Sequence, residues 1–494
     1  MAAIITEQFR KHNAEQFFES FSEAAKSTYY LFLGKSSPYT ETNDGAGNTD
    51  TNPPAPNDDV VVPYYNWDAM LASKIVSTSN VSYVVPRRNW TNSTAYDMYE
   101  HDISSSNTTN VSSKANLYDG TYYFMTTDYK VYKILDNNNG AVYSGVEPTA
   151  TSTTPFFLGG YYLQYLYTLT TSDVQTFLTN DFLPVKVDST VSGAATDGKV
   201  HVVRSIAGSG YTNGTYYTPI KGDGASGVVK IIIASGAIAA FGSSSSTSTE
   251  VFNGGTGYTY GTINLTDVYS DSALSTSTTV GAGTGGSISI VVAPKGGSGF
   301  NAIEELGGHY VMITTKFEQA DGDDVTVAND FRQVGILKDP YNYGTATICT
   351  ATTRRQTYAV KLASAPSTSY TIDEKITQAT SGAVGKVVEF DSSNNIIYYN
   401  QERFVGYGTA TNGSYTAFTG TDTITGDTST GAGTPSSTAS ETITLTGGNT
   451  IAFTSGYALP EMDPDSGKLL YVENRRPISR ASDQSEDIKI VVEF

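Results

Sequence analysis

Short runs that mix apolar and polar residues recur along this 494-residue chain, and they predict β-strands. Their apolar members are mainly Val, Ile, Tyr and Phe, which pack well on a pleated surface. Gly, Pro, Asn, Asp and Ser bound the runs and favour turns. The clearest strand candidates are VSYVVPRRNW (81–90), TYYFMTTDYKVYKIL (121–135), GYYLQYLYTLT (160–170) and IKIVVEF (488–494).

One convincing helix is predicted near the start, over residues 6–24. Thr6 can cap it, and Phe9, Phe17 and Phe21 recur at helical spacing. A second, short helix is predicted at WDAMLASKI (67–75). Between the two, residues 41–59 are dense in turn formers and show no periodicity, which predicts a long surface loop or an arm that crosses to a neighbour.

The composition changes at about residue 195, after which Gly, Ser and Thr dominate up to about residue 300. A Gly-x-Gly-aromatic signature occurs at 208–211 and 255–258 and again at 297–300. The first two are followed by a strand, a Gly-rich turn and a β-branched run. Glycine permits a positive φ at the turn, and the aromatic ring can cover the exposed backbone beside it. The pattern predicts a small repeated β-module inserted between strands of a parent domain.

A second stretch poor in large apolar residues covers 341–456, and the sequence beyond it again resembles the parent. The fold predicted is therefore mainly β: a β-sandwich parent domain with a short N-terminal helix and inserted small β-domains. The predicted boundaries are 1–194, 301–340 and 457–494 for the parent domain, and 195–300 and 341–456 for the insertions.

The charge balance narrows the classes of partner. The 49 acidic and 30 basic residues give a formal net charge of -19, which disfavours phosphate backbones and anionic membrane surfaces. One cysteine, Cys349, excludes an intramolecular disulfide and a cysteine-based zinc cluster. The sequence shows no signal-peptide pattern and no apolar run of membrane-spanning length. We therefore expect no nucleic-acid or membrane partner, and folding in a reducing cytoplasm.

Residues that could carry chemistry are scattered. The four histidines stand in unrelated contexts, and the Gly-rich segments precede β-branched runs rather than a helix, so they do not predict a phosphate loop. Carboxylates gather at 321–324 and at 461–465, where a calcium turn or an acid–base pair is conceivable and a solvated turn is the simpler interpretation. The sequence predicts no catalytic residue, no cofactor and no metal site; the histidines are His12, His101, His201 and His309.

Paired arginines are more distinctive. PRRNW contains Pro86, Arg87, Arg88 and Trp90, and a second pair stands in ENRRP at 473–477. Arg and Trp combine a large contact area with directed hydrogen bonds, so they are enriched at interface hot spots. In an acidic chain such segments predict either protein contacts or intramolecular locks against carboxylates.

These segments also carry a family resemblance. The C-terminal LLYVENRRPISRASDQSEDIKIVVEF is similar to the end of the T4-type phage baseplate wedge protein, the product of gene eight of T4-like phages. Weaker similarities occur at LFLGKSSPY, GYYLQYLYTL and FRQVGILKDP, in the order of that family. The matching candidates for an interface or structural motif are Pro86, Arg87, Arg88, Trp90, Arg332, Glu473, Asn474, Arg475, Pro477, Asp483 and Gln484.

The resemblance implies a structural subunit of a contractile tail baseplate in the virion, with no enzymatic residue. It implies a homodimer packed against other baseplate wedge proteins. The two insertions make this chain longer than that family's T4 member. The Tyr-rich composition and Gly-aromatic repeats leave a receptor- or carbohydrate-binding tail protein as the alternative, and a glycosidase that uses Asp323 or Asp463 as a second one.

Overall fold

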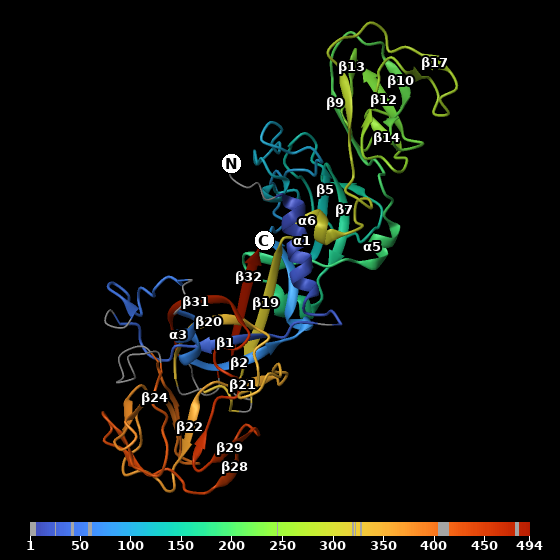
Figure 1. Cartoon of the computed structure of the whole chain (residues 1–494). Helices are drawn as coiled ribbons and strands as arrows, with labels where there is room; N and C mark the ends of the chain where they lie inside the picture. The colour runs from blue at the N-terminus through green and yellow to red at the C-terminus, as the bar shows by residue number, and fades with distance from the viewer. Residues whose placement is uncertain are drawn as a thin grey trace. The chain divides into compact units, whose positions relative to one another are not determined.

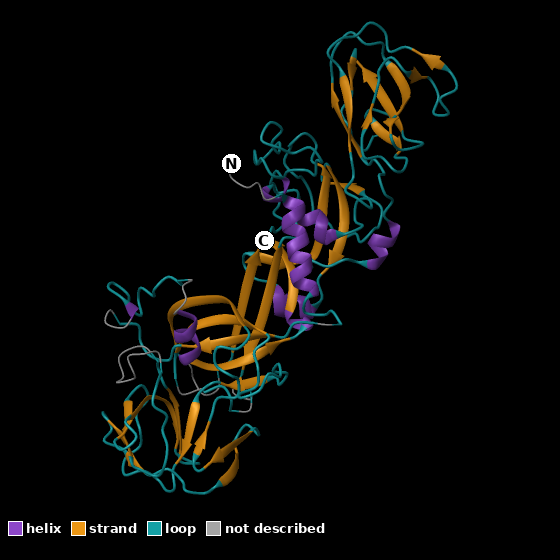
Figure 2. Ribbon diagram, in the orientation of Figure 1, coloured by secondary structure: helices purple, strands orange, loops and turns teal. Residues whose placement is uncertain are grey.

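A computed structural model of the chain describes residues 6–24, 26–40, 44–57, 62–244, 246–318, 321, 323–326, 329–403, 414–479 and 484–494. Antiparallel sheets dominate these residues, and the helices are short (Figure 2). The predicted mainly β fold is confirmed. The chain forms two compact units: unit 1 contains 1–16, 82–312 and 491–494, and unit 2 contains 17–81 and 313–490.

The predicted N-terminal helix is confirmed as α1 (Glu7–Glu19), although it ends before residue 24. The predicted helix at 67–75 is wrong, because α3 (Val62–Asp68) precedes it and Met70–Val76 form strand β2. The apolar residues at the start of β2 are buried, and the strand pairs with β1 (Tyr29–Gly34). Sheet pairing therefore overrides the local helical preference. None of the helices in the described part of the chain is long and apolar enough to cross a membrane.

Unit 1 is built around a four-stranded antiparallel sheet in the order β4-β5-β7-β6, which Figure 1 labels in part. Its strands are rich in buried tyrosine because alternate aromatic rings fill the space beneath the sheet. A second sheet has the order β32-β19-β3-β8. The elements of these two sheets and the short helices beside them are β3 (Val81–Pro86), η2 (Leu117–Asp119), β4 (Tyr123–Met125), β5 (Lys130–Asp136), β6 (Phe156–Leu158), β7 (Tyr161–Thr168), α4 (Thr171–Phe177), β8 (Phe182–Pro184), α5 (Ser189–Ala194), α6 (Ala302–Leu306), β19 (Tyr310–Phe317) and β32 (Glu486–Glu493).

A buried ion pair connects the central sheet of unit 1 to α6. Lys133 of β5 is 0% exposed, and its Nζ contacts a carboxylate oxygen of Glu305, which is 3% exposed. The same Nζ lies 3.3 Å from Ser298 Oγ and 4.7 Å from the centroid of the Tyr99 ring. The other oxygen of Glu305 accepts a hydrogen bond of 2.7 Å from the Gly299 backbone N–H. This contact fixes the segment at which the chain leaves the Gly-rich region.

That Gly-rich region forms a module with its own core within unit 1. A cluster of buried Val, Ile and Tyr side chains runs from Val200 to Val292. The first and last strands of the module, β9 and β18, pair antiparallel, so the chain enters and leaves side by side. Its strands are β9 (Val202–Ile206), β10 (Gly214–Pro219), β11 (Lys221–Gly222), β12 (Val228–Ala234), β13 (Ala237–Ile238), β14 (Glu250–Asn253), β15 (Gly261–Thr262), β16 (Val268–Tyr269), β17 (Ser277–Thr278) and β18 (Ser287–Val291).

The first two Gly-x-Gly-aromatic signatures form matching corners of this module. The Tyr211 hydroxyl accepts a hydrogen bond of 2.9 Å from the Gly286 N–H, and the Tyr258 hydroxyl accepts one of 3.0 Å from the Gly227 N–H. Each tyrosine therefore covers the Gly-rich turn of the other repeat. A Cβ on Gly224 would clash with the Tyr258 ring, so a larger residue does not fit beneath it. The third signature has another role, because its Ser298 and Gly299 contact the Lys133–Glu305 pair.

The hydrogen bonds of Tyr211 and Tyr258 predict that the two tyrosines contribute unequally to the stability of the module. Tyr258 also donates to the Ile220 carbonyl at 3.1 Å, so Tyr258→Phe leaves a buried donor and a buried acceptor unpaired. We expect a loss of about 1–3 kcal/mol in the free energy of unfolding. Tyr211→Phe removes the bond to Gly286 alone and is expected to cost less. Urea titration of both variants measures this difference, and equal stability of the two would contradict it.

Unit 2 contains a five-stranded antiparallel sheet in the order β21-β2-β1-β20-β31. Strands β1 and β20 are buried along almost their whole length, and Trp67 of α3 packs on them in a core that includes the single cysteine, Cys349. The elements of this part are β1 (Tyr29–Gly34), α3 (Val62–Asp68), β2 (Met70–Val76), η1 (Thr78–Asn80), β20 (Phe331–Lys338), β21 (Thr353–Arg355) and β31 (Lys468–Ile478).

The second atypical stretch forms a nine-stranded sheet with its own apolar core, in the order β27-β26-β23-β24-β25-β22-β30-β29-β28. It begins after β21, which pairs with β2 in the five-stranded sheet. The strands are β22 (Tyr358–Lys361), β23 (Lys375–Gln378), β24 (Ala383–Asp391), β25 (Ile396–Asn400), β26 (Ile424–Gly426), β27 (Ala432–Gly433), β28 (Ser440–Thr444), β29 (Thr450–Thr454) and β30 (Tyr457–Ala458).

Candidate functional site

The PRRNW segment lies at the end of β3, where its arginines bind backbone carbonyls within unit 1. Arg87 Nη1 donates to the Thr179 carbonyl at 2.7 Å, and Arg88 Nη2 donates to the Asp119 carbonyl at 3.1 Å. The Arg88 guanidinium also lies 5.3 Å from the centroid of the Tyr123 ring. The segment therefore holds neighbouring loops together, chiefly through backbone carbonyl groups and, at Arg87 Nε, through the side-chain oxygen of Asn89 at 3.0 Å.

The flanking residues of this segment are also integrated into unit 1. Pro86 accepts a hydrogen bond of 2.6 Å from the Tyr123 hydroxyl through its carbonyl. The Trp90 ring packs edge-on against Tyr143, with 5.9 Å between ring centroids. Its backbone N–H donates to the Met125 carbonyl at 2.8 Å. These contacts position the β3 corner against β4.

Arg332 is a buried lock in unit 2. It is 4% exposed, and its Nε and Nη2 donate to the two carboxylate oxygens of Asp50 at 2.9 and 3.0 Å. A third nitrogen, Nη1, donates to the Ser36 carbonyl. The Tyr39 hydroxyl donates to the Arg332 carbonyl at 2.9 Å. A planar guanidinium suits this two-pronged geometry, so Arg332 fixes the loop that contains Asp50 onto β20.

The ENRRP segment lies on β31, the outer strand of the five-stranded sheet. Leu470 and Tyr471 of this 11-residue strand are 46% and 38% exposed, and Arg475 is also exposed. Glu473 accepts a hydrogen bond of 3.0 Å from the Tyr471 hydroxyl. Among the described residues, backbone ladder partners of β31 come from β20 on one side. Further candidates near this strand are Pro477, which is half-buried on it, Gln484, which precedes β32, and Asp483, which lies outside the described residues.

Asn474 turns from the same strand into a cluster of amides. Gln333 Nε2 donates to the side-chain oxygens of Asn66 and Asn474, each at 2.8 Å. Asn474 Nδ2 in turn donates to the Pro54 carbonyl at 3.0 Å. These residues line a cavity of about 430 Å³ beside β31. The cluster joins the loop at 44–57 to β20 and β31, two of the segments singled out by the resemblance.

The two acidic clusters approach each other, because burial and then the nearby charge of Glu461 raise the pKa of Asp324 to about 6. The histidines have separate hydrogen-bond partners. His101 Nδ1 accepts a hydrogen bond of 3.2 Å from the Val292 N–H, and His309 Nδ1 lies 2.7 Å from the Gly307 carbonyl. Burial lowers the pKa of His201 to about 4. Asp324 Oδ2 accepts hydrogen bonds of 2.7 Å from Thr353 and Asn449, so this carboxylate already has protein partners. No group of three His, Cys, Asp or Glu side chains in the described ranges is arranged to hold a metal ion.

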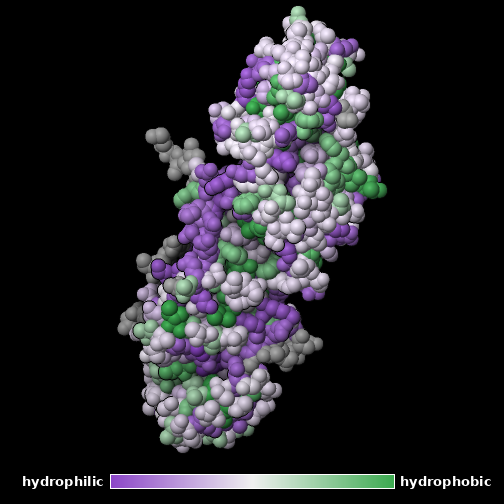
Figure 3. Space-filling model, turned by 90° about the vertical axis from the view of Figure 1, so that its right-hand side faces the viewer, coloured by the Kyte–Doolittle hydropathy of each residue, from purple (hydrophilic) through white to green (hydrophobic). Residues whose placement is uncertain are grey.

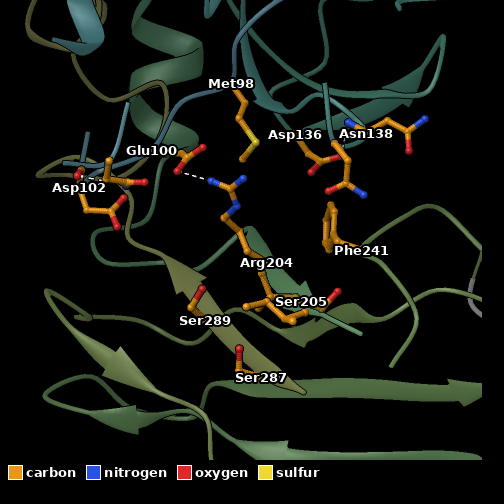
Figure 4. Close-up of a pocket in the computed structure, with 14 residues that line it drawn as sticks. Met98, Glu100, Asp102, Asp136, Asn138, Arg204, Ser205, Phe241, Ser287 and Ser289 are labelled. Carbon is orange, nitrogen blue, oxygen red and sulfur yellow. Dashed lines mark hydrogen bonds and ion pairs between the residues drawn. The ribbon is translucent and has the colours of Figure 1, made fainter. Parts of the chain in front are cut away.

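A polar cavity of about 380 Å³ lies in unit 1, between the inserted module and the loops at the end of β5 (Figure 4). One wall is the outward face of the β9–β18 ladder, where Arg204 pairs with Ser289. The opposite wall carries two buried carboxylates, Glu100 and Asp136. The cavity is lined by Met98, Glu100, Asp102, Asn107, Asp136, Asn138, Asn139, Val203, Arg204, Ser205, Ile206, Phe241, Ser287 and Ser289.

The charges in this cavity differ in how they are balanced. Arg204 Nη1 pairs with Glu100 Oε2 across the two walls, as the dashed line in Figure 4 shows. Burial raises the pKa of Glu100, and the Arg204 guanidinium opposes that shift. Asp136 is 8% exposed, and its Oδ2 accepts a hydrogen bond of 3.0 Å from the backbone N–H of Asn138. Burial raises the pKa of Asp136 to about 6. Asp136 is therefore a poorly compensated buried carboxylate beside the cavity.

The sequence did not indicate this cavity. Its residues come from four separated stretches, 98–107, 136–139, 203–241 and 287–289, and none forms a motif. One local signal was available: Asn138 and Asn139 stand in the run DNNNG, a strong turn former. Both adopt a left-handed backbone conformation, with φ of 52° and 57°. That signal places a turn and says nothing of the module that faces it.

A comparison with known protein families finds a match in the N-terminal third of the chain. Residues 3–154 match the family described as Bacteriophage T4, Gp8. This match includes α1, the PRRNW segment and the strands β1 to β5. No curated protein matches the chain significantly. The family match agrees with the resemblance carried by PRRNW, and residues 3–154 of this chain are similar to the T4 Gp8 family.

Proposed function

We propose that this protein is a non-enzymatic wedge subunit that acts through contacts with a second copy of itself and with other wedge proteins. The match of residues 3–154 to the T4 Gp8 family carries this proposal. The proposal places the subunit in the virion tail after assembly in the host cytoplasm. The formal net charge of -19 supports partners other than nucleic acid and anionic membranes.

The outer strand β31 supports a contact surface in unit 2. An outer strand exposes unpaired backbone N–H and C=O groups, which can add a strand from another chain. β31 also carries exposed Leu470 and Tyr471, two large side chains that a partner could cover. Natural proteins usually shorten or cover such a strand, whereas β31 has 11 residues. We assign this strand to the contact with the second copy.

The locks around the strand support a rigid surface rather than a catalytic one. Arg332, Gln333 and Asn474 are held by protein partners at hydrogen-bond distance. Such residues limit movement of β20 and β31 when a partner binds, which lowers the entropic cost of association. On the face shown in Figure 3, hydrophobic positions are interspersed with hydrophilic ones.

A substitution on β31 tests the homodimer. The protein is expected to have twice the chain mass of 52.7 kDa by light scattering at micromolar concentration. Leu470→Lys places a charge at the proposed contact and is expected to yield a folded monomer, because burying an unpaired charge is costly. Leu459→Lys is the matched control, since Leu459 is 50% exposed in the same unit but outside β31.

The outcomes of this test are distinct. A dimeric Leu459→Lys variant with a monomeric Leu470→Lys variant supports the contact at β31. A monomeric unaltered protein at micromolar concentration contradicts the homodimer itself. Dimers of both variants contradict the assignment to β31 and leave the membership of the wedge untouched.

The two atypical stretches are best explained as inserted modules. The strand pair β9–β18 closes the first, and its core lies between residues 200 and 292. The strands of the second run from β22 to β30. We therefore propose a parent domain interrupted twice, with the second module beginning after β21, slightly later than residue 341.

A further inference from the structure

The polar cavity of unit 1 has the composition of a binding site that a purely structural subunit does not need. Its volume of about 380 Å³ falls in the range of roughly 300–1,000 Å³ that is usual for small-molecule sites. Acceptors and donors converge on it from two walls. We propose that this cavity binds a neutral saccharide unit of a host-surface polysaccharide.

The donors and acceptors of the cavity match a ring that bears several hydroxyl groups. A hydroxyl both donates and accepts, so it can satisfy a carboxylate and an amide together. Asp136 supplies a buried acceptor, and the exposed amides of Asn138 and Asn139 supply both functions. On the other wall, Ser287 and Ser289 present exposed hydroxyl groups. A ligand hydroxyl beside Asp136 would give this carboxylate a further hydrogen-bond donor.

One aromatic ring provides a flat apolar surface. Phe241 lines the cavity and is held from behind by Phe157 and Tyr162, whose ring centroids lie 5.7 and 5.8 Å away. A ring fixed in this way can pack against the C–H face of a sugar at little entropic cost. Figure 4 shows Phe241 and Asp136 on the same side of the cavity.

The charges select the class of saccharide. Glu100, Asp102 and Asp136 face one arginine, Arg204, which is already paired with Glu100. Such an excess of carboxylates repels sulfated, phosphorylated and carboxylated sugars. The site therefore suits neutral sugars. It goes beyond the proposed structural role and does not depend on the dimer.

A substitution on β18 tests whether the Gly-rich module forms one wall of the proposed saccharide site. Ser289→Trp fills the cavity from the exposed face of β18 and leaves the buried face of that strand unchanged. Ser277→Trp is the matched control, because Ser277 is an exposed serine on β17 of the same module and does not line the cavity.

A second variant removes the side chains of Asn138 and Asn139 on the opposite wall and preserves their backbone conformation. Asn138 and Asn139 both have positive φ, which glycine adopts without strain. The double variant Asn138→Gly/Asn139→Gly therefore deletes both amides and preserves the turn. Asn395→Gly, at φ of 52° in unit 2, controls for the general effect of glycine at such a position.

The probes are purified bacterial O-antigens and capsular polysaccharides on an array, together with free pentasaccharides of glucose, galactose and N-acetylglucosamine in saturation-transfer NMR. We expect the unaltered protein to bind at least one neutral glycan, and the two array groups show whether it comes from O-antigen or capsule. Ser289→Trp should abolish binding, the double glycine variant should weaken it by about tenfold or more, and both controls should retain it.

Failure of this inference is separate from failure of the structural proposal. Binding to none of the probes, binding confined to acidic glycans, or binding that survives Ser289→Trp would overturn the saccharide site. The mass of the unaltered protein and the match to the Gp8 family would stand in each of these cases.

Discussion

Replacing Lys133 by Met is expected to lower the free energy of unfolding of unit 1 by about 3–5 kcal/mol. The substitution leaves Glu305 with a buried carboxylate and removes its counter-charge. Burial lowers the pKa of Lys133, and the attraction of Glu305 opposes this shift. The pair is therefore a case in which loss of one partner costs more than the net contribution of the intact pair.

A double substitution separates charge from packing. In Lys133→Met/Glu305→Gln, neither side chain of the former pair carries a charge, and the Gln side-chain oxygen can still accept the hydrogen bond that the Gly299 N–H donates to Glu305 in the unaltered protein. We expect the double variant to recover most of the stability that the single Lys133→Met variant loses. Near-equal losses in the single and double variants would show that the lysine stem, rather than the charge, determines the stability.

Fluorescence can follow unit 1 separately. The chain has two tryptophans: Trp90 packs on Tyr143 in unit 1, and Trp67 lies in the core of unit 2. In a Trp67→Phe background, urea unfolding monitored by Trp90 reports on unit 1. A loss smaller than about 1 kcal/mol for Lys133→Met would contradict the prediction.

Replacing Asp136 by Asn is expected to stabilise the protein at pH 7. Burial raises the pKa of Asp136 from 3.8 to about 6, so between these values the folded state binds more protons than the unfolded state. The protonated Asp136 carboxyl group therefore stabilises the folded state at low pH. This stabilisation is lost as the pH rises through about 6, where the buried group must ionise. A shift of this size corresponds to about 3 kcal/mol at neutral pH.

The pH dependence is the distinctive part of this result. The amide introduced by Asp136→Asn is neutral at every pH, so the gain should be largest at pH 7 and should disappear near pH 4. Asp102→Asn is the matched control, because the Asp102 side chain lines the same cavity and is 59% exposed. Urea titrations at the two pH values check both variants, and an Asp136→Asn variant that is less stable at pH 7 would refute the expected sign.

Local patterns sufficed for much of the fold. The β-branched and aromatic runs became strands at β3, β5, β7 and β32, and the Gly-x-Gly-aromatic signatures became turns in which Tyr211 and Tyr258 cover glycine backbone. Prediction from local patterns was wrong at 67–75, where Ala and Met favour a helix locally. There the buried start of β2 pairs with β1, a contact about 40 residues away that local propensity cannot express.

The candidate residues divide in the same way. Arg87, Arg88 and Arg332 were recognisable as residues with directed contacts, but the sequence could not show that backbone carbonyls bind the first two. The cavity that contains Asp136 and Arg204 was unpredictable, because it forms where residues from separate stretches meet. A burial-driven pKa shift likewise depends on tertiary packing and has no signature in the amino-acid order.

The pairing of β9 with β18 has a consequence for how such a chain can diversify. Because the two ends of the module emerge as neighbours, its replacement by a shorter or longer cassette requires little change in the spacing of the host strands. The entropy of closing a loop also grows only slowly with its length. Recombination at these two junctions could therefore exchange one wall of the saccharide cavity while the register of β5 and β7 is inherited intact.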